Sequence, residues 1–170
     1  MTSIGYVVGD HRGAVDTMLA QVAATLQARG RALAGVVQVN TEIAAVTRCD
    51  MDLQVLGVGD TVRISQRLGN AARGCRLDPG GLATAVGLVE QSLDGTSLLV
   101  VNKFGKMELD GGGFRMVIAR ALERGLPVLL GVNRDNLPGF LTFADGMAQE
   151  IAADPGAILT WCETQDDVGP

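Results

Sequence analysis

Short apolar runs alternate with amphipathic segments from the start of the chain. The run at residues 4–8 ends at a Gly-containing loop, residues 9–13, and apolar residues then recur with i, i+3, i+4 spacing as far as Leu26. A second apolar run covers residues 33–39. A strand, a helix and a strand in this order predict parallel pairing with a right-handed crossover. We therefore expect an α/β protein with a mostly parallel sheet.

The middle of the chain departs from this rhythm. Apolar and polar residues alternate through residues 49–55 and again through 62–65, on either side of a Gly-rich segment at 57–60. Alternation with period two around a tight turn is typical of a β-hairpin. We interpret residues 38–78, which end in an irregular basic stretch containing Arg76, as an insertion in an otherwise regular sheet domain.

The α/β rhythm returns after the insertion. Asp78 followed by Pro79 predicts the start of a helix, because Asp is a good N-cap and Pro is tolerated in the first turn. The single domain is expected to span residues 1–162, followed by a polar tail at 163–170. The remaining periodicity predicts strands at 97–101, 127–132 and 157–161, and helices at 114–124 and 138–150.

Charge and composition limit the partners. The net charge of −5 gives the chain no global reason to bind nucleic acid or an anionic membrane, so any anion site must be a local basic pocket. No apolar run reaches the ~18 residues of a membrane-spanning helix. The cysteines Cys49, Cys75 and Cys162 lack CxxC spacing, which indicates reduced, packed thiols and a cytoplasmic protein. A single histidine, His11, predicts no multi-His metal site.

Residues 98–115 carry the clearest functional signal. An apolar run stops at Asn102, and charged residues and three consecutive glycines follow before the next helix. In open α/β sheets, ligands bind outside the carboxyl ends of the strands. Lysines, close backbone approach at glycines and a helix start all suit an anion. The candidate ligand-binding residues of this segment are Asn102, Lys103, Lys106, Gly111, Gly112, Gly113 and Arg115.

Two alternatives stay open for this segment. The lysines could simply be solvated. Glu108, the candidate catalytic residue, could orient a lysine, hold a cation or act as a base. Arg115 at a helix start opposes the helix dipole unless an anion or Glu108 lies nearby.

The loop after the first strand has the context of a phosphate-binding P-loop. It lacks the Gly-Lys-Ser/Thr ending, because Ala14 and Val15 stand where the cation and the hydroxyl are required. Backbone N–H groups around Asp10 and Gly13 could still bind an anion, with Arg12 as a substitute cation. The alternative is a plain β–α turn in which His11 is exposed to solvent.

Two resemblances follow from these motifs. Val101-Asn-Lys-Phe-Gly-Lys-Met-Glu-Leu109 resembles the Asp-Glu-Ile-Gly-Lys-Met-Glu-Leu motif of the thermophile-type P-loop nucleoside triphosphatases, with Asn102 and Lys103 at the Walker B Asp-Glu. This resemblance implies a P-loop-like three-layer sandwich. The chain also resembles an uncharacterised bacterial family whose genes often lie beside molybdate-transport genes. The motifs that carry this second resemblance are at residues 49–53, 64–66, 74–79 and 101–106.

Three functions are compatible with these features. The first is a cytoplasmic binding protein for a nucleotide or an oxyanion such as molybdate or phosphate, linked to molybdenum or metalloenzyme homeostasis. The second is a divergent nucleoside triphosphatase with weak or no activity, in which Asp10 or Glu108 positions Mg²⁺ or water. The third is a non-enzymatic partner or regulatory protein acting through the hairpin insertion. The exposed hairpin could also form a homodimer by edge pairing.

Overall fold

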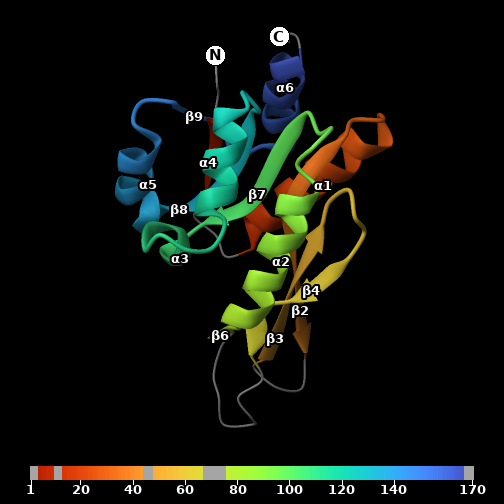
Figure 1. Ribbon diagram of the computed structural model, residues 1–170, viewed down its shortest axis with the longest axis vertical. Helices are drawn as coiled ribbons and strands as arrows, with labels where there is room; N and C mark the ends of the chain where they lie inside the picture. Colours follow the sequence, from red (N-terminus) through yellow and green to blue (C-terminus); the bar gives the residue numbers. More distant parts are fainter. Residues whose placement is uncertain (1–3, 10–12, 44–47, 67–75, 167–170) are drawn as a thin grey trace.

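The computed structural model describes residues 4–9, 13–43, 48–66 and 76–166 (Figure 1). The strands are β1 (Ile4–Gly9), β2 (Leu33–Ile43), β3 (Arg48–Val55), β4 (Thr61–Arg63), β5 (Ser65–Gln66), β6 (Arg76–Leu77), β7 (Leu98–Phe104), β8 (Val128–Asn133) and β9 (Ala148–Glu150). The helices are α1 (Ala14–Ala28), α2 (Pro79–Gln91), α3 (Lys106–Leu109), α4 (Arg115–Glu123), α5 (Leu137–Ala144) and α6 (Pro155–Asp166), with a 3₁₀ turn η1 (Arg134–Asn136).

A seven-stranded sheet forms the centre of the fold. Its strand order is β4-β3-β2-β7-β8-β1-β9, and the pairs from β2 to β9 are all parallel. Strands β3 and β4 extend the β2 edge in antiparallel pairing. The expected mostly parallel α/β sheet with an added β-hairpin is therefore confirmed.

Helices cover both faces of the sheet. One hydrophobic cluster joins the sheet to α2, α4 and α5, through buried residues such as Leu82, Ile118 and Phe140. The other joins it to α1 and α6, through residues such as Leu19 and Ile158. Two helical layers around one sheet make the three-layer sandwich that the resemblance implied, and Figure 1 shows α2 and α4 together on the same side.

Helix α2 begins as its sequence predicts. Asp78 is the N-cap, its side chain accepts a hydrogen bond from Gly80 N at 3.1 Å, and Pro79 occupies the first turn.

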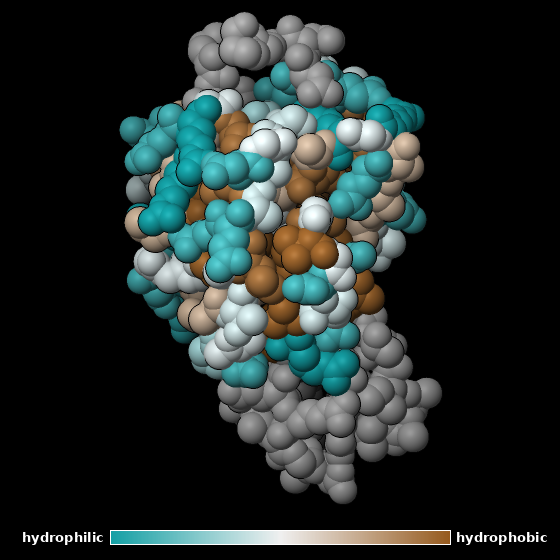
Figure 2. Space-filling model, turned by 45° about the vertical axis from the view of Figure 1, so that its right-hand side comes forward, coloured by the Kyte–Doolittle hydropathy of each residue, from teal (hydrophilic) through white to brown (hydrophobic). Residues whose placement is uncertain are grey.

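Hydrophobic side chains also reach the surface, where Figure 2 shows them gathered in the middle of one face. Residues 79–89 of α2 carry no charged side chain, so apolar packing rather than ion pairing holds most of this helix on the sheet.

The antiparallel part of the sheet extends beyond the predicted hairpin, because β2 also pairs with β3. Strand β2 does not end at residue 39 but continues to Ile43 and pairs with β3 as far as Arg48. The predicted turn at residues 57–60 is present between β3 and β4, and an ion pair from Arg63 Nε to Asp52 Oδ1 at 2.8 Å spans this strand pair. The segment predicted to be irregular also contains the short antiparallel pair β5–β6.

Two C-terminal predictions are wrong. Residues 157–161 are not a strand but belong to α6, in which Ile158, Trp161 and Cys162 are buried with helical spacing. Asp154 begins this helix, since its Oδ2 accepts a hydrogen bond from Ala157 N at 2.9 Å. An apolar run of five residues does not distinguish a strand from a buried helix face. The helix continues into the predicted tail as far as Asp166.

The helix predicted at residues 138–150 is longer than the helix that the structure shows there. Helix α5 ends at Ala144, because Asp145 and Gly146 take left-handed conformations with φ of 47° and 82°. The residues that follow return to the sheet as β9, which pairs in parallel with β1. The last strand is therefore β9 and not the predicted strand at residues 157–161.

Candidate functional site

The carboxyl ends of β7, β8 and β1 define the candidate site. These three strands are neighbours in the sheet and run parallel to one another. The loops that follow them therefore open at the same edge, where ligands bind in open α/β sheets. The long helix α1 begins at this edge, with Gly13 as its N-cap.

Strand β7 runs further than its hydrophobicity predicts. The apolar run stops at Asn102, but the strand continues to Phe104 with a register irregularity after Val101, and Phe104 pairs with Val132. Asn102 and Phe104 are buried, while Lys103 between them is exposed. Lys103 therefore lies on the strand, and Lys106 is the first residue of α3. The sequence missed this extension because a buried Asn is indistinguishable from a loop residue by polarity alone.

Asn102 joins three elements at this edge. Its Oδ1 accepts a hydrogen bond from Gln38 N of β2 at 3.0 Å, and its Nδ2 donates to Asp16 Oδ1 of α1 at 2.6 Å. Its side chain is 3% exposed, so burial strengthens the need for these partners. The end of β7 is consequently fixed against the first turn of α1.

Gly131 of β8 makes room for this contact. A Cβ at this position would lie 2.4 Å from Asn102 O and 2.9 Å from Val15 Cγ1. The absence of a side chain lets α1 approach the sheet closely beside β7. Asp16, Gln38 and Gly131 were not among the residues predicted from the sequence. A lone glycine within an apolar strand is the one available signal, since it often marks close backbone approach.

Glu108 is buried inside the turn that follows β7. Its Oε1 accepts from Gly105 N at 2.8 Å and its Oε2 accepts from Phe114 N at 3.1 Å. Burial raises the pKa of this carboxyl above its ordinary value of 4.5, while the two backbone donors and Lys103 act in the opposite direction. One oxygen holds the backbone at the start of α3 and the other holds the backbone at the start of α4, so the arrangement suits a structural role better than Mg²⁺ or water positioning.

The glycine run fits the same turn. Gly113 has a φ of 57°, and a Cβ there would lie 1.7 Å from Glu108 Oε2. Gly112 N donates to Met107 O at 2.8 Å, and Gly111 N donates to Glu108 O at 3.2 Å. These amides serve the internal packing of the turn, which accounts for the glycines without a ligand.

Arg115 also has internal partners. Its Nη1 donates to Glu108 O at 3.2 Å and to Leu109 O at 3.4 Å, at the C-terminal end of α3. Its guanidinium carbon lies 5.0 Å from the ring centroid of Phe143. Arg115 therefore ties α3, α4 and the α5 region together, which explains a cation at the start of α4.

The two lysines are exposed cations at this edge, as is Arg134 directly after β8. Lys103 and Lys106 are exposed, and neither forms an ion pair with any residue that the structure describes. The Lys103 side chain passes Gly105, where a Cβ would lie 3.8 Å from Lys103 Cε. The positive charge of Lys103 acts on Glu108 only by lowering its pKa, against the larger effect of burial.

The other predicted site residues are only partly described. Asp10, His11 and Arg12 lie outside the described residues, as do Cys75 and the side chains of Cys49 and Arg76. Arg76 is described as a strand residue of β6 paired with Gln66. Gly13 is the N-cap of α1 with a φ of 81°, and it supplies no side-chain cap. Within the described ranges, no three His, Cys, Asp or Glu residues gather as a metal site, and no helix there is long and apolar enough to cross a membrane.

The sheet order, the two helical layers and the edge at α1 define an α/β protein with the architecture of P-loop nucleoside triphosphatases. The solution structure of a human cancer-related nucleoside triphosphatase superposes with a TM-score of 0.60 at 15% identity, covering 99% of this chain and 95% of that chain. The crystal structure of THEP1 from Aquifex aeolicus has a TM-score of 0.60 at 12% identity, covering 96% of each chain.

The chain belongs to the family described as protein of unknown function DUF2478, whose profile matches residues 4–161. It is also 32% identical over 148 residues to the molybdenum import ATP-binding protein ModC 2 of Bradyrhizobium diazoefficiens. That similarity covers 86% of this chain but only 16% of the length of the ModC 2 protein.

Proposed function

We propose that this protein binds a nucleotide or another tetrahedral oxyanion at the carboxyl edge of its parallel sheet. The observation that supports this most directly is the hydrogen bond from Asn102 to Asp16, because it holds the end of β7 against the start of α1. The first N–H groups of α1 lack partners within the helix, and the N-cap Gly13 has no side chain to satisfy them. The positive end of the helix dipole favours an anion there.

The lysines support the same proposal. Lys103 and Lys106 are the two lysines of the chain, among 14 basic residues, and both lie in the β7–α3 segment next to this edge. Their ammonium groups are exposed and form no ion pair with described residues, so an arriving anion displaces no protein carboxylate from them. We assign them to charge neutralisation of the ligand.

Binding is a better proposal for this edge than hydrolysis. Ala14 and Val15 replace the Lys and the Ser/Thr of a P-loop, and Asn102 stands where the similar triphosphatases carry an acid. The carboxylate of Asp16 lies beside Asn102, and it is the observation that keeps a divergent nucleoside triphosphatase as the second candidate. In that candidate Asp16 takes the metal-handling role that Glu108 is too internally engaged to fill.

The similarity to ModC 2 supports a finer version of the proposal. That protein is named for molybdenum import and ATP binding, and this chain matches one part of it. We propose that the ligand is ATP or molybdate and that the protein serves molybdenum homeostasis.

Thermal unfolding with and without ligand tests the proposal. A ligand that binds only the folded state raises the unfolding midpoint. ATP, phosphate and molybdate are each added at millimolar concentration to the wild type, to Lys103→Ala and to the control Arg124→Ala. Arg124 is an exposed cation paired with Asp94, away from the site. We expect a rise in midpoint for at least one anion, lost in Lys103→Ala and kept in Arg124→Ala. No rise with any of the three anions contradicts the proposal.

Phosphate release from ATP tests the second candidate. A divergent triphosphatase loses its activity in Asp16→Ala and in Lys106→Ala. Release that persists in both variants comes from a contaminant, and it excludes hydrolysis at this site.

A further inference from the structure

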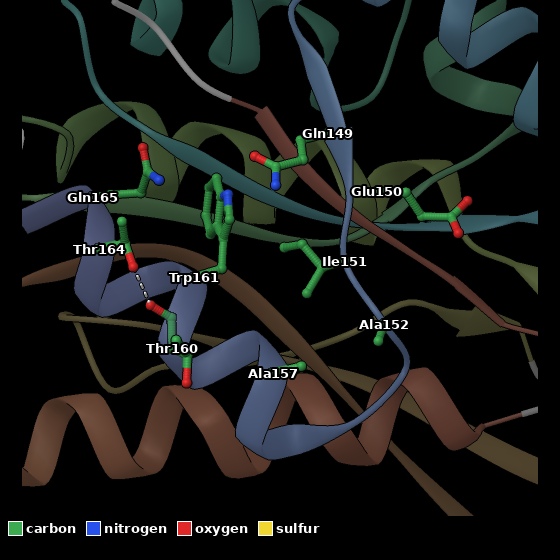
Figure 3. Close-up of a pocket in the computed structure, with 9 residues that line it drawn as sticks. All are labelled: Gln149, Glu150, Ile151, Ala152, Ala157, Thr160, Trp161, Thr164 and Gln165. Atoms are coloured by element: carbon green, nitrogen blue, oxygen red, sulfur yellow. Dashed lines mark hydrogen bonds between the residues drawn. The ribbon is translucent and has the colours of Figure 1, made fainter.

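A second pocket lies between the edge strand β9 and helix α6, and it shares no residue with the proposed anion site (Figure 3). Its volume is about 350 Å³. The residues that line it come from β9, the segment after it and one side of α6: Gln149, Glu150, Ile151, Ala152, Ala157, Thr160, Trp161, Thr164 and Gln165. The pocket is an open hollow at the surface and not an enclosed cavity.

Trp161 brings an unpartnered hydrogen-bond donor to this pocket. The residue is 7% exposed, and its Nε1 is buried with no hydrogen-bond partner among the residues that the structure describes. The indole ring packs against β1, where a Cβ on Gly5 would lie 2.7 Å from its Cε2 and Cζ2. A buried donor without a partner is unfavourable and points to an acceptor that is supplied from outside.

The polar groups around the indole match an amide. Gln149 and Gln165 present carboxamides, and Figure 3 shows the Gln149 side chain beside the indole. The hydroxyls of Thr160 and Thr164 donate to helix carbonyls at 2.9 and 2.8 Å, so they can offer a ligand only acceptor lone pairs. A ligand that both accepts and donates hydrogen bonds satisfies this set.

The charge of the lining excludes the class of ligand proposed for the other site. Among the described residues that line the pocket, Glu150 is the one charged residue, and none is a lysine or an arginine. An anion would therefore lose hydration without gaining a cation. Ile151, Ala157 and the indole supply an apolar side for the rest of a neutral molecule.

We propose that this pocket binds a neutral carboxamide, with Trp161 Nε1 donating to the carbonyl oxygen and the amide N–H donating to the Gln149 side-chain oxygen. A free aromatic amide and the backbone of an extended peptide share this chemistry. One edge of β9 pairs with β1 and the other pairs with no strand that the structure describes, which is compatible with the peptide.

Trp161 is the single tryptophan of the chain, so its fluorescence reports on this pocket directly. The probes are benzamide for the free amide, N-acetyl-Ala-Ala-N-methylamide for the peptide, and benzoate as the anionic control. We expect a saturable change in the emission with at least one of the two amides and none with benzoate. Saturation by benzamide alone identifies a small-molecule site, and saturation by the peptide alone identifies a strand-docking site.

Two variants test the contacts. Gln149→Leu keeps the size of the side chain and weakens amide binding by about tenfold, the upper end for one neutral hydrogen bond. The matched control Gln54→Leu, at an exposed residue of β3, leaves it unchanged. Equal affinities in the wild type and Gln149→Leu overturn the assignment of Gln149. The absence of a saturable response to either amide up to its solubility limit, or an equal response to benzoate, overturns the proposed site.

Discussion

The Asn102 carboxamide donates from Nδ2 to Asp16 Oδ1 over 2.6 Å, joining residues that are 86 positions apart in the chain. A hydrogen bond to a carboxylate is shorter and stronger than one between neutral groups. It connects the end of β7 to the first turn of α1 at the edge where the ligand is proposed to bind. The candidate site therefore depends on the amide at position 102.

Asn102→Asp is expected to destabilise the protein by about 2 kcal/mol or more, because it removes a donor to a carboxylate and adds a second negative charge beside Asp16. Mg²⁺ is expected to raise the unfolding midpoint of this variant more than that of the wild type, since paired carboxylates bind a hard cation. Denaturant unfolding with and without Mg²⁺ measures both effects.

Asn133→Asp is the matched control for this variant. Asn133 ends the neighbouring strand β8 and is exposed, so the same change of charge meets water there. We expect little loss of stability and no selective effect of Mg²⁺. Equal behaviour of the two variants would show that the Asn102–Asp16 contact contributes nothing.

Gly131→Ala is expected to destabilise the protein by about 2–3 kcal/mol, because the added Cβ would meet Asn102 O at 2.4 Å. Gly87→Ala in α2 is the opposite case. Nothing lies within 4 Å of its added Cβ, so the change should stabilise the helix by about 0.5–1 kcal/mol. Urea unfolding compares the two. A neutral effect at Gly131 would contradict the close approach of α1 to the sheet.

Glu108→Gln is expected to destabilise the protein by about 1–3 kcal/mol, because one of the two backbone donors then faces an NH₂ group. Burial raises the pKa of Glu108 above 4.5, so the folded state binds the proton more tightly than the unfolded chain. The contribution of Glu108 to stability therefore increases as the pH falls from above the folded pKa toward 4.5.

The difference in unfolding free energy between wild type and Glu108→Gln measures this dependence. It should be larger near about pH 5 than near about pH 8. A difference that is constant over this range would mean that the Glu108 carboxyl is not desolvated in the folded state.

Asp154→Ala is expected to cost about 1 kcal/mol through the loss of the α6 N-cap, while Asp154→Asn should lose only a few tenths. Thermal unfolding of the two variants makes the comparison. If both lose the same amount, the charge rather than the cap geometry stabilises the start of α6.

The periodic segments of the chain predicted most of the fold, and the ambiguous segments did not. Helices α1 and α2 follow clear apolar spacing, α2 has a good N-cap in Asp78, and strands β7 and β8 are strongly apolar. The apolar run near Trp161 fits either a strand or a helix. The N-cap at Asp154, which lies outside this run, favours the helix. The short strand β9 could not be predicted from an apolar run, since it is only three residues long.

The sheet edge that carries the candidate site could be predicted from the sequence, but the side-chain contacts at this edge could not. The repeated α/β pattern predicts parallel strands. Parallel strands place their carboxyl ends, and the loops that follow, at one edge of the sheet. The roles of Glu108 and Arg115 depended on a compact turn in which a carboxylate and a guanidinium bind backbone groups. Asp16 was hidden because an acidic residue in the first turn of a helix is ordinary in any protein.

We propose that Lys103 and Lys106 contact an anionic ligand. Acetylation of their amines tests this contact most directly. These are the two lysines of the chain, so mass spectrometry can follow both with the N-terminal amine as internal reference. With saturating ATP or molybdate, we predict that acetylation of both lysines slows several-fold while that of the N-terminus is unchanged. Equal acetylation rates with and without either ligand would contradict the account.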